Sequence, residues 1–153
     1  MLPLLAALAA SLAFSDRVAA LRELKSAFQT QLIPTLRRTS FLGLGAVSFA
    51  AGVGEEVFFR AFLQTAVIKG LALLPALPAS GAVALGIGST SVFFGALHAL
   101  NPAYFVYATL AGGLFGWQYH AFGLTAAAIT HSLYDWIALV AILRTWGREK
   151  TAA

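Results

Sequence analysis

Four stretches of the chain are apolar and about as long as a membrane-crossing helix. They cover residues 41–68, 82–100, 103–119 and 122–143. A spanning helix needs about 20 mainly apolar residues. Short breaks separate the stretches, among them Lys69-Gly70 and Asn101-Pro102. The pattern predicts an all-α fold in which four core spans form one membrane helix bundle.

The chain begins differently, with two shorter helical patterns. Residues 2–14 are apolar but short for a full span, so they predict either a short N-terminal helix or the core of a signal peptide. The residues that follow carry one apolar stripe at steps of three and four, formed by Val18, Leu21, Leu24, Phe28 and Leu32. This stripe predicts an amphipathic helix at the membrane surface, capped by Ser15 and ended by Pro34.

The composition also indicates a membrane environment. Hydrophobic residues make up 59% of the chain and charged residues 10%, against about 25% charged in soluble domains. The protein is therefore expected to be an integral, multi-pass membrane protein. Its 153 residues leave room for one domain, residues 1–153. The absence of cysteine excludes disulfides, thiolate metal sites and cysteine nucleophiles.

The basic residues lie in two clusters outside the predicted spans. The first comprises Arg17, Arg22, Lys25, Arg37 and Arg38, and the second comprises Arg144, Arg148 and Lys150. Four spans separate the clusters, so an even number of crossings places both on one side, which the positive-inside rule makes cytoplasmic. Basic residues placed in this way set the orientation of the protein in the membrane. They do not form a basic face on a soluble surface, so no nucleic-acid partner is expected. The expected partners are membrane lipid and a protein or peptide substrate.

A few ionisable residues fall inside the predicted spans. They are Glu55, Glu56, Arg60, His98, His131 and Asp135. Glu56 precedes Arg60 by four residues, the favoured order for an ion pair within a helix, and this pair is expected to support helix packing. Glu55 lies about 100° around the helix from Glu56 and has no local basic partner. An unpaired carboxylate at membrane depth is a candidate functional group.

The histidines supply the partners for such a carboxylate. His131 and Asp135 lie four residues apart on one helical face. One carboxylate beside an imidazole can take a proton from water, while a second imidazole and its neighbour stabilise the oxyanion of an attacked peptide carbonyl. Phe94, four residues before His98, is expected to form an apolar wall. The same two histidines and two carboxylates also suit zinc. Spacing alone leaves both kinds of site open.

Three ordered motifs in separate spans resemble those of the CPBP intramembrane proteases, which include the type II CAAX prenyl endopeptidases and proteins of bacteriocin processing and immunity. The family pattern is EExxxR, FxxxH and HxxxN or HxxxD. It appears here as Glu55 to Arg60, Phe94 to His98 and His131 to Asp135, within residues 35–140. The resemblance implies an all-helical membrane endopeptidase in a prokaryotic inner or plasma membrane, with substrate entering from the membrane or the cytoplasmic side.

The resemblance also implies a role for each motif residue. Glu55 and His98 would activate the water, and His131 and Asp135 would hold the oxyanion or the substrate carbonyl. Glu56, Arg60 and Phe94 would support the site. A glutamic-type protease without a metal or other cofactor is the favoured expectation. The alternative is a metalloprotease in which Glu55, His98, His131 and Asp135 bind zinc.

Two positions depart from the family pattern. Ala61 stands where glycine is common after the arginine, and Asp135 stands where asparagine is commoner. An ionised aspartate cannot donate a hydrogen bond to an oxyanion. Asp135 must therefore be protonated or act by orienting His131.

Two other functions remain open at the level of sequence. A non-catalytic membrane scaffold or immunity protein of the same family would keep the motif residues as structural contacts. A proton-coupled carrier would also bury glutamates and histidines, but the chain shows no inverted repeat. For the protease, C-terminal processing of prenylated or sorting-tail substrates is the expected reaction.

Overall fold

The computed structural model describes residues 1–148, and all regular secondary structure in this part of the chain is helical. Two of the segments, η1 and η2, are π-helices. The elements in chain order are α1 (Leu2–Phe14), α2 (Ala19–Ala27), η1 (Phe28–Leu32), α3 (Ile33–Leu36), α4 (Phe41–Glu56), η2 (Val57–Gln64), α5 (Thr65–Leu71), α6 (Ala79–Leu97), α7 (Pro102–Phe122) and α8 (Leu124–Thr145).

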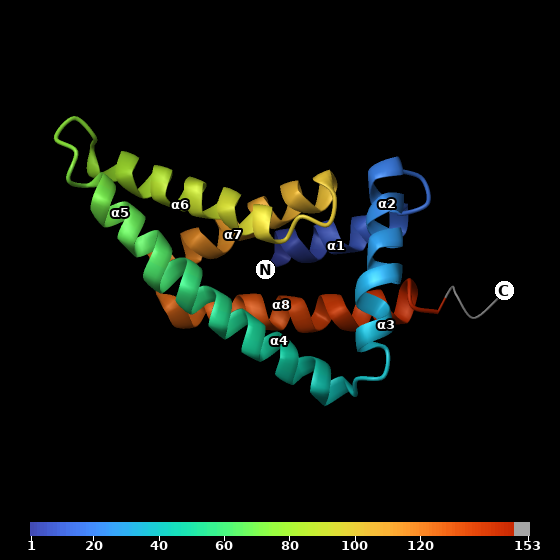
Figure 1. Cartoon of the computed structure of the whole chain (residues 1–153). Coiled ribbons are helices and arrows are strands. Elements are labelled where there is room, and N and C mark those ends of the chain that lie inside the picture. Colours follow the sequence, from blue (N-terminus) through green and yellow to red (C-terminus); the bar gives the residue numbers. More distant parts are fainter. Residues whose placement is uncertain (149–153) are drawn as a thin grey trace.

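Four long helical units run back and forth along the bundle. The first is α4, η2 and α5, which are continuous from Phe41 to Leu71. It starts beside α3 and ends at the opposite end of the molecule, where α6 begins, and then α6, α7 and α8 alternate in direction (Figure 1). The expected all-α membrane bundle is therefore confirmed.

The helices differ in how well they suit a membrane. Three are long and apolar enough to cross one: Phe41–Leu71, Ala79–Leu97 and Leu124–Thr145. A fourth candidate is the pair Leu2–Phe14 and Ala19–Leu36, which is bent by 96°. The predicted span at residues 103–119 corresponds to α7, which has 21 residues but is not among these apolar candidates. Helix α7 packs against α6, α8 and α2. Part of its surface therefore contacts protein instead of lipid, and that part need not be apolar.

The amphipathic helix begins later than expected. Val18, not Ser15, is its N-cap residue. Ser15 instead lies at the C-terminal end of α1, where its hydroxyl donates to the Leu12 carbonyl at 3.3 Å. Short polar side chains favour both kinds of helix end, so Ser15 by itself did not reveal which helix it belongs to. Leu24 and Phe28 of the predicted stripe are buried, whereas Val18 is exposed.

Pro34 does not end this helix. Proline lacks an N–H and its ring clashes with the carbonyl four residues earlier in a regular α-helix. Here η1 precedes the proline, and the Ile33 N–H bonds to the Phe28 carbonyl five residues back. This wider turn lets helical structure continue through α3. The joined α2, η1 and α3 cross one end of the bundle (Figure 1), as expected of an interfacial helix.

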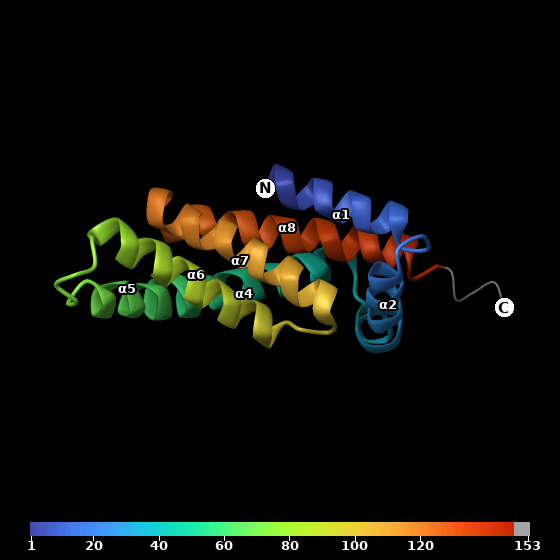
Figure 2. The same cartoon turned by 90° about the horizontal axis from the view of Figure 1, so that it is seen from above.

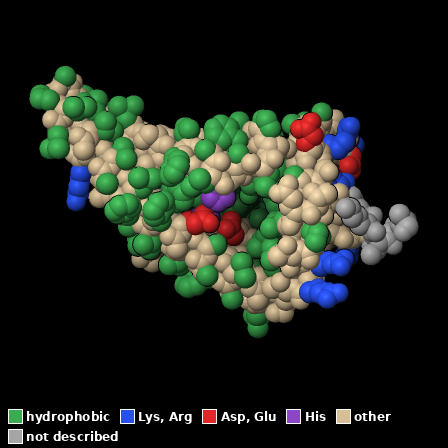
Figure 3. Space-filling model, in the orientation of Figure 1, with side chains coloured by type: hydrophobic (Ala, Val, Ile, Leu, Met, Phe, Trp, Pro, Cys, Tyr) green, Lys and Arg blue, Asp and Glu red, His purple; other side chains and the backbone are tan. Residues whose placement is uncertain are grey.

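The two basic clusters lie at the same end of the bundle. Figure 3 shows Lys and Arg side chains gathered where α2, α3 and the end of α8 lie, whereas Lys69 belongs to α5 at the other end. Lys150 of the second cluster lies outside the described residues. The arrangement agrees with the predicted even number of crossings.

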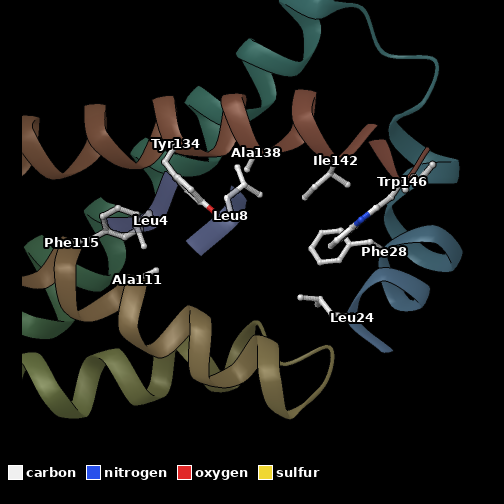
Figure 4. Packing of buried hydrophobic residues seen from close by; sticks show 11 residues of the cluster. Leu4, Leu8, Leu24, Phe28, Ala111, Phe115, Tyr134, Ala138, Ile142 and Trp146 are labelled. Atoms are coloured by element: carbon white, nitrogen blue, oxygen red, sulfur yellow. The ribbon is translucent and has the colours of Figure 1, made fainter. Parts of the chain in front are cut away.

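The main apolar core joins the N-terminal helices to α7 and α8. Helix α1 lies along α8 (Figure 2) and contributes two buried leucines. The buried members are Leu4, Leu8, Leu24, Phe28, Ile33, Ala111, Phe115, Tyr134, Ala138, Ile142 and Trp146 (Figure 4). The Phe28 ring packs against Trp146 with centroids 5.8 Å apart, and the Gln29 amide donates to the Trp146 carbonyl at 3.0 Å. These contacts hold the amphipathic helix against the C-terminal end of α8.

This arrangement predicts the membrane topology. A reporter fused after Arg38 and one fused after Arg148 should both be cytoplasmic, and one inserted in the connection 72–78 should lie on the opposite side, because α4, η2 and α5 cross in between. Reporter activity or protease accessibility on intact cells measures the sides. Opposite sides for Arg38 and Arg148 would contradict the topology.

Candidate active site

The site forms where α4 approaches α8 very closely. A Cβ atom placed on Gly52 would lie 2.8 Å from the backbone nitrogen of Ser132 and 2.9 Å from its Cα. Only glycine permits this approach, because the nearest atoms include the opposing backbone, which cannot move aside. The contact sets the residues that follow Gly52 beside His131.

Three charged or polar side chains then form a buried chain across the two helices. Arg60 Nε lies 3.2 Å from Glu56 Oε2, and His131 Nδ1 lies 2.8 Å from Glu56 Oε1. Glu56 and Arg60 are fully buried, and His131 is 5% exposed. The predicted Glu56–Arg60 pair is therefore present. Its link to His131 was missed, although a buried carboxylate has a second oxygen that needs a partner.

Helix α7 completes this chain through its glycines. The Arg60 guanidinium donates to the Gly112 carbonyl at 3.1 Å, and one turn later the Gln64 amide donates to the Gly116 carbonyl at 3.0 Å. A Cβ atom on Gly116 would approach the Gln64 side-chain oxygen to 2.7 Å. The GxxxG spacing thus brings backbone acceptors within reach of α7's neighbour. Gln64 is a buried residue that sequence analysis missed. A polar residue one turn after Arg60 in an apolar span is the signal that could have identified it.

The segment that carries Arg60 and Gln64 is π-helical. In η2 the Thr65 N–H bonds to the Arg60 carbonyl, five residues back, and the Thr65 hydroxyl donates to the same carbonyl at 3.0 Å. A π-turn inserts an extra residue and rotates the side chains that follow. It lies directly after the glutamate pair, where such distortions often accompany function.

His98 is oriented by the end of α6. The helix stops at Leu97, and the His98 Nδ1 atom lies 2.8 Å from the Phe94 carbonyl oxygen. Because a carbonyl can only accept, Nδ1 carries the proton and Nε2 of the neutral ring is an acceptor. That Nε2 lies 3.4 Å from Glu55 Oε2. The Phe94 ring stacks on the imidazole with centroids 4.2 Å apart.

Glu55 and Asp135 meet at the same place. Each has 31% of its side chain exposed, and His98 has 30%. The Nε2 atom of His131 lies 3.9 Å from Glu55 Oε2 and 3.4 Å from Asp135 Oδ2. Acidic and histidine side chains are visible together in a hollow at the middle of the bundle (Figure 3). All four residues that the sequence singled out as catalytic are thus brought together.

A small cavity lies over these groups. It has a volume of about 70 Å³ and is lined by Glu55, His98, His131 and Asp135, together with three tyrosines. This is room for a few water molecules. The tyrosines are Tyr104, Tyr107 and Tyr134, and the hydroxyls of Tyr107 and Tyr134 are hydrogen bonded to each other. Sequence analysis missed them because tyrosine is enriched at membrane interfaces and therefore does not by itself mark a site.

The zinc alternative can be compared with this geometry. Within residues 1–148, no group of three or more His, Asp or Glu side chains is arranged to hold a metal ion. Both Nδ1 atoms bond to protein oxygens, as those of zinc-ligating histidines usually do. Donor types and ring orientation therefore suit zinc, whereas the side-chain positions do not surround an ion. A metal-free reaction stays a prediction.

Comparison with known proteins gives the family. The model of the type II CAAX prenyl endopeptidases, Rce1-like, matches residues 37–137. The chain belongs to this family. The matched residues of this Rce1-like protein include all three motifs and the whole buried chain. Its family and its apolar helices make it an integral multi-pass membrane protein with CAAX-protease-type activity. Searches of curated proteins and of solved structures gave no match.

The close approach at Gly52 predicts a difference between two neighbouring glycines. Gly52→Ala should lower the free energy of unfolding by about 1–3 kcal/mol, because the new methyl group meets the α8 backbone. Gly54→Ala is the matched control, since a Cβ atom there meets nothing within 4 Å. Thermal unfolding of the two variants in detergent measures the effect. Equal stabilities would contradict the close packing of α4 on α8.

The buried chain predicts that Arg60 is required for folding. Arg60→Ala leaves Glu56 buried without its arginine, which costs about 3–5 kcal/mol. Arg60→Lys should also lose stability, because one ammonium group cannot reproduce the planar fork that reaches both Glu56 and the Gly112 carbonyl. Folded yield by size-exclusion chromatography checks both variants. A monodisperse Arg60→Ala protein with unchanged stability would contradict this role.

Proposed function

We propose that this Rce1-like protein is an intramembrane endopeptidase that hydrolyses a peptide bond with a water molecule activated by Glu55 and His98. The observation that supports this most directly is the orientation of His98. Its Nδ1 proton is engaged by the Phe94 carbonyl, so its acceptor nitrogen faces the Glu55 carboxylate at 3.4 Å, beside a cavity with room for water. A general base must lie within hydrogen-bond reach of the water it activates, and both groups line this cavity.

In the proposed reaction, water donates a hydrogen bond to the Glu55 and His98 pair and attacks the carbonyl carbon of the substrate. A carbon–oxygen bond forms, the carbonyl oxygen becomes an oxyanion, and the pair takes up the water proton. The pair then gives this proton to the leaving amide nitrogen as the carbon–nitrogen bond breaks. The products are a new carboxyl end and a new amino end, and the pair returns to its starting state.

His131 is the proposed donor to the oxyanion. Its Nδ1 proton is shared with Glu56 at 2.8 Å, so only Nε2 faces the cavity. In the protonated ring, Nε2–H donates to the oxyanion while Nδ1–H stays on Glu56. Asp135 Oδ2 lies 3.4 Å from the same Nε2, so it accepts Nε2–H and orients the ring until the oxyanion forms and shares that hydrogen. This role removes the difficulty that an ionised aspartate cannot itself donate to an oxyanion.

The surroundings of the site support an apolar substrate segment. Tyr104, Tyr107, Tyr134 and Asp135 line both the catalytic cavity and a neighbouring chamber of about 210 Å³. The rest of that chamber is mainly aliphatic and aromatic, with walls from α1, the amphipathic helix and α8. A peptide whose scissile carbonyl lies at His131 can therefore place apolar groups in the chamber. We infer that the reaction is C-terminal processing of a prenylated or sorting-tail substrate in a prokaryotic inner or plasma membrane.

The proposal predicts cleavage that depends on Glu55. Membranes from cells that carry wild type should contain peptides with defined new termini, and these should disappear with Glu55→Gln or His98→Ala, because each change removes one proton acceptor. Quantitative mass spectrometry of membrane-protein termini measures this. Glu23→Gln, an exposed acid on the amphipathic helix, is the control. If Glu55→Gln retained all the termini, the non-catalytic scaffold function would be favoured instead.

Asp135 separates the metal-free reaction from the zinc alternative. If Asp135 orients His131, Asp135→Asn should keep much of the cleavage rate, because the amide oxygen still accepts from Nε2–H, and Asp135→Ala should lose it. For a zinc ligand, the neutral amide would weaken metal binding and make the variant more sensitive to chelators. Cleavage rates in detergent with and without chelator, together with the zinc content, provide the test. Stoichiometric zinc with an inactive Asn variant would contradict the metal-free reaction.

A further inference from the structure

A groove lies far from the catalytic cavity, where the start of α4 meets the end of α8. It has a volume of about 250 Å³. Three arginines line it: Arg37 from the α3–α4 connection, Arg144 from the last turn of α8, and Arg148 from the turn after that helix. No acidic side chain among residues 1–148 forms an ion pair with Arg37 or Arg144. Arg37 and Arg144 therefore bring positive charge to the groove that no acidic side chain among residues 1–148 neutralises.

Apart from Thr39, the remaining walls of the groove are apolar. Phe41 and Leu44 come from α4, and Val140 and Leu143 come from α8. These two helices belong to units that are apolar enough to cross a membrane, and the arginines lie at their ends. The groove thus changes from apolar to cationic along the bundle axis, at the level where a helix leaves the hydrocarbon and meets the headgroups.

We propose that this groove binds an anionic phospholipid, with the phosphodiester headgroup among Arg37, Arg144 and Arg148 and the acyl chains against the apolar walls. The charge and the polarity of the groove match such an amphiphile. Guanidinium groups suit phosphate because their paired N–H donors fit its oxygens, and basic pockets between membrane helices take lipid headgroups. A soluble phosphate would use only the cationic half of the groove.

Such a lipid would connect two elements that carry the catalytic groups. Helix α4 leads to Glu55, and α8 carries His131 and Asp135. A headgroup held by Arg37 on one side and by Arg144 on the other bridges these helices at their far ends, in addition to the close approach at Gly52. The lipid is therefore expected to raise the stability of the bundle, whether or not a substrate is present.

The experiment measures stabilisation of the purified full-length protein in a non-ionic detergent. Phosphatidylglycerol should raise the unfolding temperature in a saturable way, and phosphatidylcholine with the same acyl chains should raise it much less. The half-saturating concentration of phosphatidylglycerol should rise about fivefold in Arg37→Gln and in Arg144→Gln, because each substitution removes one basic side chain from the headgroup. The double variant should need a higher concentration still.

Arg38→Gln is the matched control. It removes the same charge from the neighbouring exposed position, but Arg38 does not line the groove. This variant should bind phosphatidylglycerol as wild type does. Inorganic phosphate at the same concentrations should give no comparable stabilisation, because it cannot use the apolar walls.

Three results would overturn the proposal. Equal stabilisation by phosphatidylcholine would remove the role of headgroup charge. An equal weakening of binding in Arg38→Gln and Arg37→Gln would show attraction to the basic end as a whole and not to the groove. Full stabilisation by inorganic phosphate would assign the groove to a soluble anion. None of these results depends on the proposed peptidase activity, so the lipid site and the catalytic function are tested separately.

Discussion

The buried chain of Arg60, Glu56 and His131 is the interaction on which the site depends. Glu56 has no exposed surface and uses its two carboxylate oxygens on two different helices. A buried charge is costly unless its partners are held in place, and losing one partner costs more than the pair itself contributes. Arg60 also bonds to α7 through the Gly112 carbonyl. Breaking this network would leave a buried charge without its partner, so the network holds three helices in register.

A second set of polar groups, which are not part of this network, lines the cavity. Glu55 is next to Glu56 in sequence but lies on a different face of the helix, with about a third of its side chain exposed. His98 reaches it from the end of α6, and Asp135 reaches His131 from one turn further along α8. A buried inner layer therefore supports an accessible outer layer. This division suits a reaction that needs fixed donors and acceptors but also needs water and a substrate to enter.

The sequence predicted the features that depend on local spacing. The three motifs, the long helices and the Glu56–Arg60 pair follow from apolar length and from residues four apart. The bond between Glu56 and His131 could not be predicted, because spacing does not show which distant helix a second carboxylate oxygen faces. Pro34 was wrongly predicted to end the helix. The π-turn before it accommodates a residue without an N–H, and sequence patterns do not reveal such turns. The places of Tyr104 and Tyr107 at the cavity and the partner of Gln64 depend on how α7 is rotated about its axis, which is seen only once its glycines are packed against η2 and α6.

The central claim is that Glu55 and His98 direct a water molecule onto the substrate carbonyl without a covalent intermediate. A single turnover in H₂¹⁸O, with enzyme in excess over a cleaved substrate, tests this most directly. If water attacks the carbonyl itself, the new carboxyl end of every product molecule carries one heavy oxygen after the first turnover, and Glu55 carries none. If the Glu55 carboxylate attacked and water then opened the resulting anhydride at the Glu55 carbonyl, the first product would be unlabelled and Glu55 would carry the heavy oxygen, which would contradict the account.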